Sequence, residues 1–323
     1  MANPMKSDYD EPISLSQPPS AMDVFVNKAF RNLTYIFTWA MVLLLAAILL
    51  KIGGQAIPAM QKVGLTFLTS TTWDVNTGQF GILPEIWGTL YSSFLALALG
   101  GFFGVTIAIF LTQDFLPHKV EIVLKSIIEL LAAIPSVVYG LWGIFVLIPL
   151  IRPVADFLYA HFSWLPFFSS TLSGPGMFPA ALVLSIMILP TVAAISQDAL
   201  RAIPHKTKEA AFGMGATRWE AILRVMLPTA SGGIFGALVL GLGRALGETM
   251  ALAMLVGNSN QISLSVFAPA NTLASLLALN FPEAAEREVS LLMYAACILM
   301  LITLLVNIAG TAIIAATGSG VRK

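Results

Sequence analysis

Long apolar runs separated by short polar stretches fill most of this chain. Six of the runs reach the length of about twenty residues that a helix needs to cross the hydrocarbon core of a membrane. They lie at about 33–52, 88–112, 122–150, 177–199, 230–256 and 289–316. The pattern predicts an all-α polytopic membrane protein with six transmembrane helices, which form a membrane domain over 33–316.

The two ends of the chain have a different character. Residues 1 to about 21 are rich in proline, serine and acidic side chains, which predicts a disordered tail. Met22–Asn32 sets apolar side chains against basic ones, so we expect a short helix at the membrane interface to complete an N-terminal region, 1–32. Residues 317–323 form a short C-terminal tail.

Composition narrows the class of protein. Hydrophobic residues make up 57% of the chain and charged residues 11%, which excludes a soluble domain of 323 residues. The formal net charge is zero, so the total charge gives no indication of a nucleic-acid partner. Cys297 is the only cysteine, which excludes a disulfide within the chain.

Basic residues are distributed unevenly about the six spans. An even number of spans leaves both termini on one side, and that side carries twelve Lys and Arg residues against four on the other. The four are Lys51, Lys62, Arg152 and Arg287, and the twelve are Lys6, Lys28, Arg31, Lys119, Lys125, Arg201, Lys206, Lys208, Arg218, Arg224, Arg322 and Lys323. Because positively charged loops stay in the cytoplasm, both termini are predicted to be cytoplasmic.

One polar stretch, Ile203–Pro228, lies between the fourth and fifth apolar runs on that cytoplasmic side. Pro204 predicts the start of a helix. Gly213 and Gly215 predict its end, because glycine adopts positive φ without a steric penalty. The stretch is therefore expected to begin with one short helix that closes in a glycine turn.

A second helix is predicted after the glycines. Thr217 and Glu220 have the spacing of a capping box, in which each side chain bonds to the backbone N–H of the other residue. Pro228 is predicted to end this helix. The two helices would display five apolar side chains, namely Ala210, Ala211, Phe212, Met214 and Trp219. Such a patch indicates a protein partner, and the alternative is a hairpin that packs only on its own bundle.

The fifth apolar run contains two charged residues, Arg244 and Glu248, near its middle. Each would cost about 3 kcal/mol at that depth, so neither is expected to face lipid. A spacing of four places both on one face of a continuous helix, where they could pair, and Gly243 and Gly247 would let another helix approach. The pair is either part of an anion pathway, since a guanidinium group matches an oxyanion, or a structural ion pair between helices.

The third apolar run contains Pro135 at membrane depth, followed by Gly140 and Gly143. A proline there removes a backbone hydrogen bond and bends the helix, which is tolerated where neighbouring helices or a water-lined cavity satisfy the backbone. We therefore interpret Pro135, Ser136 and Tyr139 as pathway-lining or hinge residues. A kinked helix with a packing role alone is the equal alternative.

The polar stretch resembles the EAA loop of ABC-importer permeases. Glu209-Ala210-Ala211 is followed after three residues by Gly215 and after nine more by Val225-x-Leu227-Pro228, which is the order and spacing of that loop. In the family, the loop forms the coupling helix that docks into the ATPase subunit. The resemblance implies an ATPase-coupling role for Glu209, Ala210, Ala211, Gly215, Leu227 and Pro228.

Two membrane motifs narrow the resemblance. GRALGETMA (243–251) and IPSVVYGLWG (134–143) are similar to segments of phosphate-specific ABC permeases, and most of all to their C subunit. The resemblance implies the MetI-like permease fold and a permease subunit of an ATP-driven phosphate importer in the bacterial inner membrane. It also implies that Arg244 and Glu248 line the substrate pathway.

The same resemblance implies a set of partners. These are a sister permease subunit, two ATPase subunits, a periplasmic phosphate-binding protein and membrane lipid, with no nucleic acid. The chain has no GxxxxGK[ST] motif, so it is expected to bind no cofactor itself, and ATP and Mg²⁺ would be used by the partner ATPase.

Other classes of function fit the residues less well. A binding-protein-dependent permease for another oxyanion or solute would share most of these features. A channel or secondary transporter that works without ATP would leave the EAA spacing unexplained. An enzyme is disfavoured because the chain lacks HExxH, CxxC and GxSxG, and its histidines, His118, His161 and His205, lie far apart in the sequence. No catalytic residue and no metal site is therefore predicted.

Overall fold

The computed structural model describes residues 20–74, 77–113 and 115–318 of the chain. The described residues fall into two compact units, one that ends at Lys51 and one that begins at Ile52. Most of the predicted N-terminal tail and most of the C-terminal tail lie outside the described residues.

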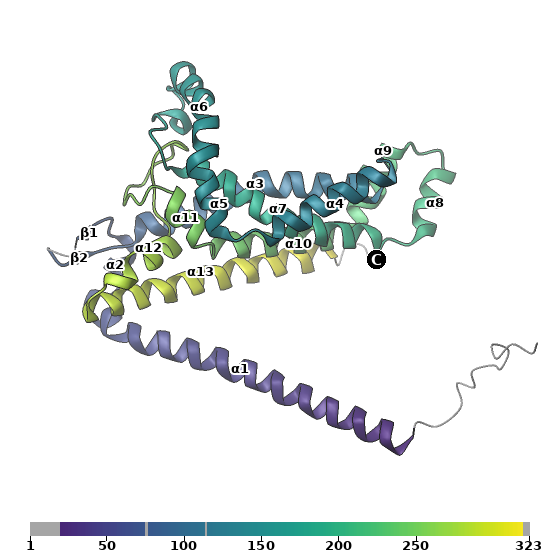
Figure 1. Cartoon of the computed structure of the whole chain (residues 1–323), viewed down its shortest axis with the longest axis horizontal. Helices are drawn as coiled ribbons and strands as arrows, with labels where there is room; N and C mark the ends of the chain where they lie inside the picture. The colour runs from purple at the N-terminus through teal and green to yellow at the C-terminus, as the bar shows by residue number, and fades with distance from the viewer. Residues whose placement is uncertain (1–19, 75–76, 114, 319–323) are drawn as a thin grey trace, which may run out of the picture. The chain divides into compact units, whose positions relative to one another are not determined.

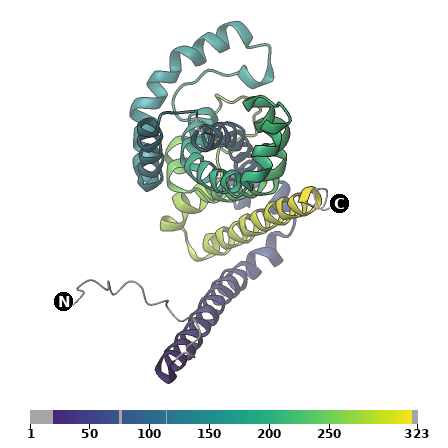
Figure 2. The same ribbon diagram turned by 90° about the vertical axis from the view of Figure 1, so that its right-hand side faces the viewer.

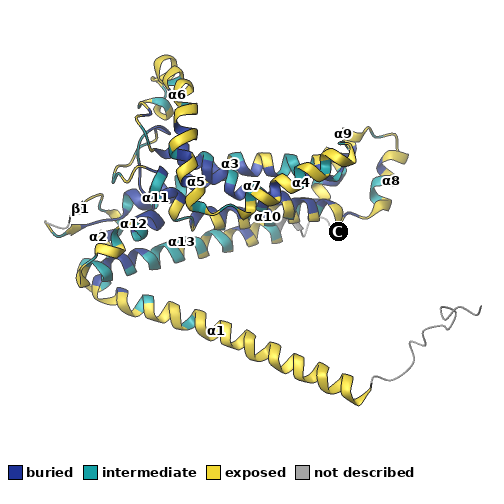
Figure 3. Ribbon diagram, viewed as in Figure 1, coloured by how far each residue is buried: buried dark blue, intermediate teal, exposed yellow. Residues whose placement is uncertain are grey.

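Helix α1, Ala21–Val63, contains the first apolar run. The prediction of a separate interfacial helix over Met22–Asn32 was wrong, because the helix continues without a break into the apolar run. No glycine or proline interrupts the chain from Ala21 to Leu50, so nothing in the local sequence ends the helix there. Up to Lys51 its side chains are exposed almost throughout (Figure 3), as expected of a helix whose apolar surface faces lipid.

The second unit is built on three long helices that pack together: α3 (Leu83–Thr112), α7 (Met177–Arg201) and α10 (Leu227–Leu246). Helix α13 (Glu286–Gly318) packs along α10 (Figures 1 and 2). Glycine permits close contact between these helices, since a Cβ atom on Gly100 of α3 would lie 2.6 Å from the carbonyl oxygen of Ser185 in α7. Small residues at helix interfaces let backbones approach in this way within a membrane.

The third apolar run does not form one helix, so the prediction of a span over 122–150 was wrong in its bounds. Helix α4, His118–Ala133, lies beside α7 and ends before Pro135. Ile134 is extended, with φ −70° and ψ 127°, because a residue that precedes proline is pushed out of the α region. The chain then turns away from α4 (Figure 1) and continues through α5 (Ser136–Trp142), the π-helical turn η1 (Gly143–Leu147) and α6 (Ile148–Phe162).

The fifth apolar run is also interrupted, so the single helix predicted over 230–256 was wrong. Three elements precede the fifth apolar run: α8 (His205–Gly213), α9 (Arg218–Ala221) and the π-helical turn η3 (Ile222–Met226). Helix α10 ends at Leu246, and a short helix, α11, covers Met250–Leu255. The residues between them, 247–249, are not helical.

Six helices of the described chain are long and apolar enough to cross a membrane, which agrees with the number predicted. They cover Ala21–Val63, Leu83–Thr112, Ser136–Phe162, Met177–Arg201, Arg218–Leu246 and Glu286–Ala315. The all-α class with six membrane-spanning helices is therefore confirmed.

Short elements fill the connections at the end of the second unit opposite α8 (Figure 1). They are α2 (Thr66–Thr69), the antiparallel strands β1 (Trp73–Asp74) and β2 (Gln79–Phe80), η2 (Pro166–Phe168), α12 (Leu273–Asn280) and η4 (Phe281–Glu283). Phe67 of α2 is fully buried and stacks on Tyr294 of α13 with 4.9 Å between ring centroids. Aromatic packing of this kind anchors the connections to the bundle.

Candidate coupling surface and substrate pathway

The glycine turn between α8 and α9 depends on one glycine. Gly215 has φ +84°, whereas Gly213 belongs to α8, so the positive φ predicted for Gly213 was wrong. The N–H of Gly215 donates to the Phe212 carbonyl at 2.9 Å, and the N–H of Ala216 donates to the Ala211 carbonyl at 3.2 Å. These bonds close the end of α8 in the manner of a glycine-capped helix.

The predicted capping box at the start of α9 is confirmed. The Thr217 N–H donates to Glu220 Oε2 at 2.9 Å, and the Glu220 N–H donates to Thr217 Oγ1 at 3.4 Å. The Thr217 hydroxyl also donates to Glu220 Oε2 at 2.8 Å. This arrangement fixes the direction in which the chain enters α9.

Most of the predicted apolar patch is exposed in this chain. Phe212, Met214 and Trp219 are exposed, Met214 to 83%, and Ala210 is exposed as well. Ala211 was expected in the patch, but it is only 2% exposed, because it faces the bundle and joins a buried cluster that includes Leu200, Ile203 and Ile222.

Two neighbouring contacts shape the surface around this patch. The ring of Trp219 stacks on Phe115, with 5.0 Å between centroids, and the Arg218 guanidinium lies over the Phe115 ring, 5.1 Å from its centroid. A cavity of about 280 Å³ between α8 and α9 is lined by residues that include Met214 and Glu220. The surface combines exposed apolar side chains with a shallow hollow, which is the shape that a partner's side chain can fill.

Pro228 does not end the second helix, so that prediction was wrong. The π-helical turn η3 precedes it, and the N–H of Leu227 donates to the carbonyl of Ile222, five residues back. The extra residue shifts the hydrogen-bond register, so Pro228 falls in the first turn of α10, where its missing N–H disrupts little. The Thr229 hydroxyl donates to the Val225 carbonyl at 2.6 Å and satisfies one backbone group at this junction.

Arg244 and Glu248 do not share one helix face, and the pairing predicted from their spacing is not found. Among the residues that the structure describes, ion pairs gather around Glu121, and none joins Arg244 to Glu248. The spacing argument assumed a continuous helix, but α10 ends at Leu246 and Gly247 has φ −94° and ψ 0°. Glu248 instead accepts a hydrogen bond from the Ala251 N–H at 3.3 Å and so caps the start of α11.

Of the two glycines predicted to let another helix approach, only Gly243 faces one in the described part of the chain. A Cβ on Gly243 would lie 3.5 Å from Asn307 Oδ1, so this glycine does face α13. Gly247 lies outside the helix, and among the described residues an added Cβ would meet only the backbone of the preceding turn within 4 Å. The space beside Gly247 is therefore open in this chain.

After the non-helical residues 247–249, helix α11 packs against α5. A Cβ on Gly140 would lie 2.6 Å from Met254 Sδ, and one on Gly143 would lie 2.7 Å from Leu255. The two glycines of the third run therefore allow this close packing. Arg244 is exposed in the single chain and lies within electrostatic range of the Tyr139 hydroxyl. The structure thus gathers Tyr139, Arg244 and the non-helical residues near Glu248 into one region.

A hydrogen bond from Tyr139 to the Leu131 carbonyl, which the sequence did not reveal, lies at the break made by Pro135. The Leu131 carbonyl would normally accept from the N–H of residue 135, which proline lacks. The Tyr139 hydroxyl donates to that carbonyl instead, at 2.8 Å, and the side chain is only 5% exposed. Tyr139 therefore satisfies the group that Pro135 leaves free. The pathway-lining or hinge role of Pro135, Ser136 and Tyr139 stays a prediction, with a packing role as its alternative.

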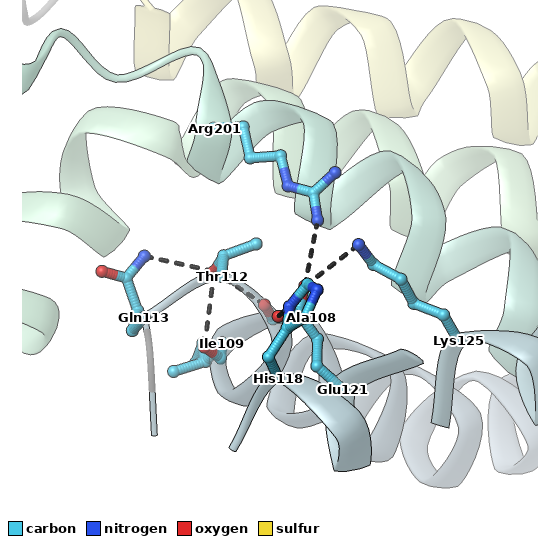
Figure 4. Close-up of polar contacts among 8 residues, drawn as sticks. All are labelled: Ala108, Ile109, Thr112, Gln113, His118, Glu121, Lys125 and Arg201. Atoms are coloured by element: carbon cyan, nitrogen blue, oxygen red, sulfur yellow. Dashed lines mark hydrogen bonds and ion pairs between the residues drawn. The ribbon is translucent and has the colours of Figure 1, made fainter. Parts of the chain in front are cut away.

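An ion-pair network at the α8 end of the unit was also missed from the sequence (Figure 4). Glu121 of α4 lies 3.0 Å from Lys125, 3.8 Å from His118 and 3.9 Å from Arg201 of α7. The hydrogen bond from Lys125 holds the pKa of the Glu121 carboxyl below its usual range. Exposed pairs of this kind stabilise a fold only slightly, so the network orients α4 on α7 more than it strengthens the fold.

Fold and sequence together define a class of transport protein. The family model described as "Binding-protein-dependent transport system inner membrane component" matches residues 100–322, and the chain belongs to this family. It is therefore a multi-pass inner-membrane component of a transporter and not a catalytic subunit.

Curated relatives narrow the comparison. The phosphate transport system permease protein PstC of Haemophilus influenzae is 39% identical, with 88% of this chain and 91% of that protein covered. The protein of the same name in Pasteurella multocida is 40% identical and covers 86% and 88%, respectively. A probable PstC of Methanocaldococcus jannaschii is 35% identical over 79% of this chain and 83% of its own length.

Solved structures share the fold at low identity. A chain of the inward-facing MetNI methionine ABC transporter matches with a TM-score of 0.56 and 21% identity, over 73% of this chain and 95% of its own. A chain of a bacterial ABC transporter involved in alginate import matches with a TM-score of 0.54 and 17% identity, over 90% and 99%. These similarities confirm the predicted MetI-like permease fold.

Proposed function

We propose that this chain is the permease subunit of an ATP-driven importer of inorganic phosphate and forms half of its transmembrane pathway. The proposal is supported by relatives named as phosphate permeases over most of their length. The structural observation that carries it is Arg244, an exposed arginine beside an interruption in a membrane-spanning helix. An arginine in an apolar membrane-spanning run is costly where it faces lipid, so we expect it to face a water-lined pathway or a partner subunit.

Arg244 and Glu248 act together in this proposal, although they do not form an ion pair. The planar guanidinium group offers several N–H donors that match the oxygens of an oxyanion. Near neutral pH, phosphate still carries at least one P–OH donor, whereas sulfate carries none. The Glu248 carboxylate can accept a bond from that hydroxyl and repels an anion that lacks it, which favours phosphate over sulfate.

The turn between α8 and α9 is proposed to couple the pathway to an ATPase partner. Its apolar side chains, Phe212, Met214 and Trp219, are exposed in this chain. The resemblance to the EAA loop covers Glu209, Ala210, Ala211, Gly215, Leu227 and Pro228. Ala211 contributes indirectly, since its buried side chain holds α8 against the bundle.

The rest of the assembly follows from the family. The chain would pair with a sister permease, two ATPase subunits that use ATP and Mg²⁺, and a periplasmic phosphate-binding protein. Both termini and α8 would lie in the cytoplasm, where the positive-inside rule places them.

Reconstitution of the whole transporter tests this function. The chain is co-expressed with its sister permease, ATPase and binding protein, and the purified complex is placed in vesicles. Phosphate on the binding-protein side is expected to stimulate both ATP hydrolysis and phosphate uptake, and sulfate at equal concentration is expected to do neither. Uptake that persists without ATP, or stimulation by sulfate or another solute in place of phosphate, contradicts the proposal.

A further inference from the structure

A buried carboxyl group lies in the first turn of α3, away from Arg244 and Glu248 along the chain. Glu85 is 0% exposed, and its Oε1 accepts a hydrogen bond from Asn271 Nδ2 at 3.5 Å. The same Asn271 amide donates to Asn260 Oδ1 at 3.4 Å, and Asn271 itself is 1% exposed. Burying a carboxyl group is costly unless it is well satisfied, and Oε2 has no hydrogen-bond partner among the described residues.

Asn260 and Asn271 belong to residues 257–272, which connect α11 to α12 and which we name the return segment. One face of α3 holds this segment by further hydrogen bonds. Trp87 Nε1 donates to the Ser263 carbonyl at 3.1 Å, and the Tyr91 hydroxyl donates to the Leu264 carbonyl at 2.8 Å. Helix and segment are also in direct contact, since a Cβ on Gly88 would lie 1.9 Å from the Asn271 carbonyl oxygen.

The return segment begins at a bend directly after α11. Gly257 has φ +99° and Asn258 has φ 47°, and Asn258 is the one residue other than glycine with positive φ in the described ranges. The N–H of Ala270, near the far end of the segment, donates to the Val256 carbonyl at 2.8 Å. The segment therefore folds back on the last turn of α11 and determines where that turn lies.

Helix α11 connects the return segment to the pathway. It has six residues, so it is about 9 Å long, and a displacement at one end is transmitted to the other. Its first turn is capped by Glu248, whose carboxylate accepts from the Ala251 N–H. A path of direct contacts thus runs from Glu85 through Asn271 and α11 to Glu248.

We propose that Glu85 and Asn271 are positioning residues that hold the return segment on α3 and, through α11, set the position of Glu248. The role of Glu248 in this inference rests on the proposed function. The movement of the return segment and α11 does not. When the Glu85–Asn271 bond is lost, Trp87 and Tyr91 still hold the middle of the return segment on α3. The end of the segment near Asn271 is then held less firmly, and residues 247–249 become more accessible. The coupling surface on α8 and α9 is untouched by this change.

A cysteine at Thr249 measures the displacement. The full transporter complex is prepared with Cys297→Ala and Thr249→Cys, and the rate of modification by a small maleimide is compared among Glu85 variants. Glu85→Leu is expected to raise the rate of modification at the introduced cysteine by about fivefold. A change of this size follows from the loss of one hydrogen bond, which shifts the population toward the more accessible arrangement. Glu85→Gln keeps an oxygen acceptor of similar shape for Asn271 and is expected to label at the rate of the parent protein.

Ser93 supplies a matched control on the same helix. It is 0% exposed and its Oγ has no hydrogen-bond partner in the described part of the chain, but no hydrogen bond ties it to the return segment. Ser93→Ala is expected to leave the labelling rate unchanged. An equal change in Ser93→Ala and Glu85→Leu would mean that any buried substitution in α3 has this effect, which overturns the proposal.

The remaining outcomes separate a positioning role from a purely structural one. Parental labelling in an assembled Glu85→Leu complex, or equal effects of Glu85→Leu and Glu85→Gln, overturns the proposal. If Glu85→Leu does not assemble, Glu85→Asp replaces it, since the shorter side chain loses the contact with Asn271 but remains a carboxyl group. Parental labelling in Glu85→Asp then counts against the proposal. Labelling requires no phosphate, so its result is independent of whether phosphate is the substrate.

Discussion

At the scale of single residues, substitution of Arg244 is expected to have the largest effect on transport. Its guanidinium group is exposed and has no ion-pair partner among the described side chains, so it is free to bind an anion. Arg244→Gln is expected to reduce phosphate uptake on the order of a hundredfold, because two charge-assisted hydrogen bonds of about 1.5 kcal/mol each are lost. Uptake by vesicles that contain the reconstituted complex measures the effect.

The control for this prediction is the exchange of the two charges. Because Arg244 and Glu248 form no ion pair in this chain, Arg244→Glu combined with Glu248→Arg is expected to stay inactive. Arg244→Gln should leave the yield of assembled complex unchanged. Recovery of full uptake by the exchanged pair, together with failed assembly of the single variants, would show that the pair is a structural clasp.

Gly215 is the second residue whose substitution has a definite expectation. A side chain at φ +84° costs about 1–2 kcal/mol in left-handed backbone strain, although the space around it is open in this chain. Gly215→Val is therefore expected to distort the turn and to lower ATPase association and ATP-driven uptake. Gly213→Ala is the matched control, because Gly213 is helical with nothing within 4 Å of an added Cβ. Normal uptake by Gly215→Val would remove the coupling role assigned to this turn.

At the scale of elements, one side chain satisfies a backbone group at the break between α4 and α5. The Tyr139 hydroxyl satisfies the Leu131 carbonyl that Pro135 leaves without a donor. Tyr139→Phe leaves this carbonyl unpaired in an apolar setting, which is expected to lower the free energy of unfolding by about 1–3 kcal/mol. Thermal unfolding of the purified complex in detergent measures the loss, with Tyr159→Phe as a control at a more exposed position. An unchanged unfolding temperature in Tyr139→Phe would mean that another group satisfies the carbonyl.

Interruptions within the apolar runs limited what the sequence could predict about elements. Hydropathy reports that a run is buried in membrane or protein, but it does not report whether the run is one helix. The break before Pro135 follows from a local rule, because the residue that precedes proline avoids the α region. No such rule predicts the break at 247–249, after which α11 packs against Gly140 and Gly143, about a hundred residues earlier in the sequence. Only the folded chain shows it.

The same limit explains which parts of the candidate site were predicted. Turn and cap chemistry is local, so the capping box of Thr217 and Glu220 and the positive φ of Gly215 could be predicted. The pairing of Arg244 with Glu248 assumed a continuous helix and was wrong for that reason. Glu85 was missed because its partner, Asn271, is 186 residues away, and no local pattern signals such a contact.

At the scale of the whole molecule, the uneven distribution of basic residues predicts which side of the membrane each connection occupies. Between Gly213 and Ser259 the chain has one helical run that is long and apolar enough to cross the membrane, Arg218–Leu246. That run has 29 residues and is about 44 Å long, longer than the hydrocarbon core of about 30 Å. The two positions are therefore predicted to lie on opposite sides, with Gly213 in the cytoplasm.

Cysteine labelling from each side tests this arrangement. In a Cys297→Ala background, Gly213→Cys is expected to react with a membrane-impermeant maleimide only in inverted vesicles, because α8 lies with the cytoplasmic loops. Ser259→Cys, in the return segment, is expected to react only from the outside of intact cells whose outer membrane is permeabilised. Both positions are at least partly accessible in the single chain, so absence of labelling from one side reflects the membrane. Labelling of both cysteines from one side would contradict the six-span arrangement, and reversal of the two results would contradict the orientation assigned from the basic residues.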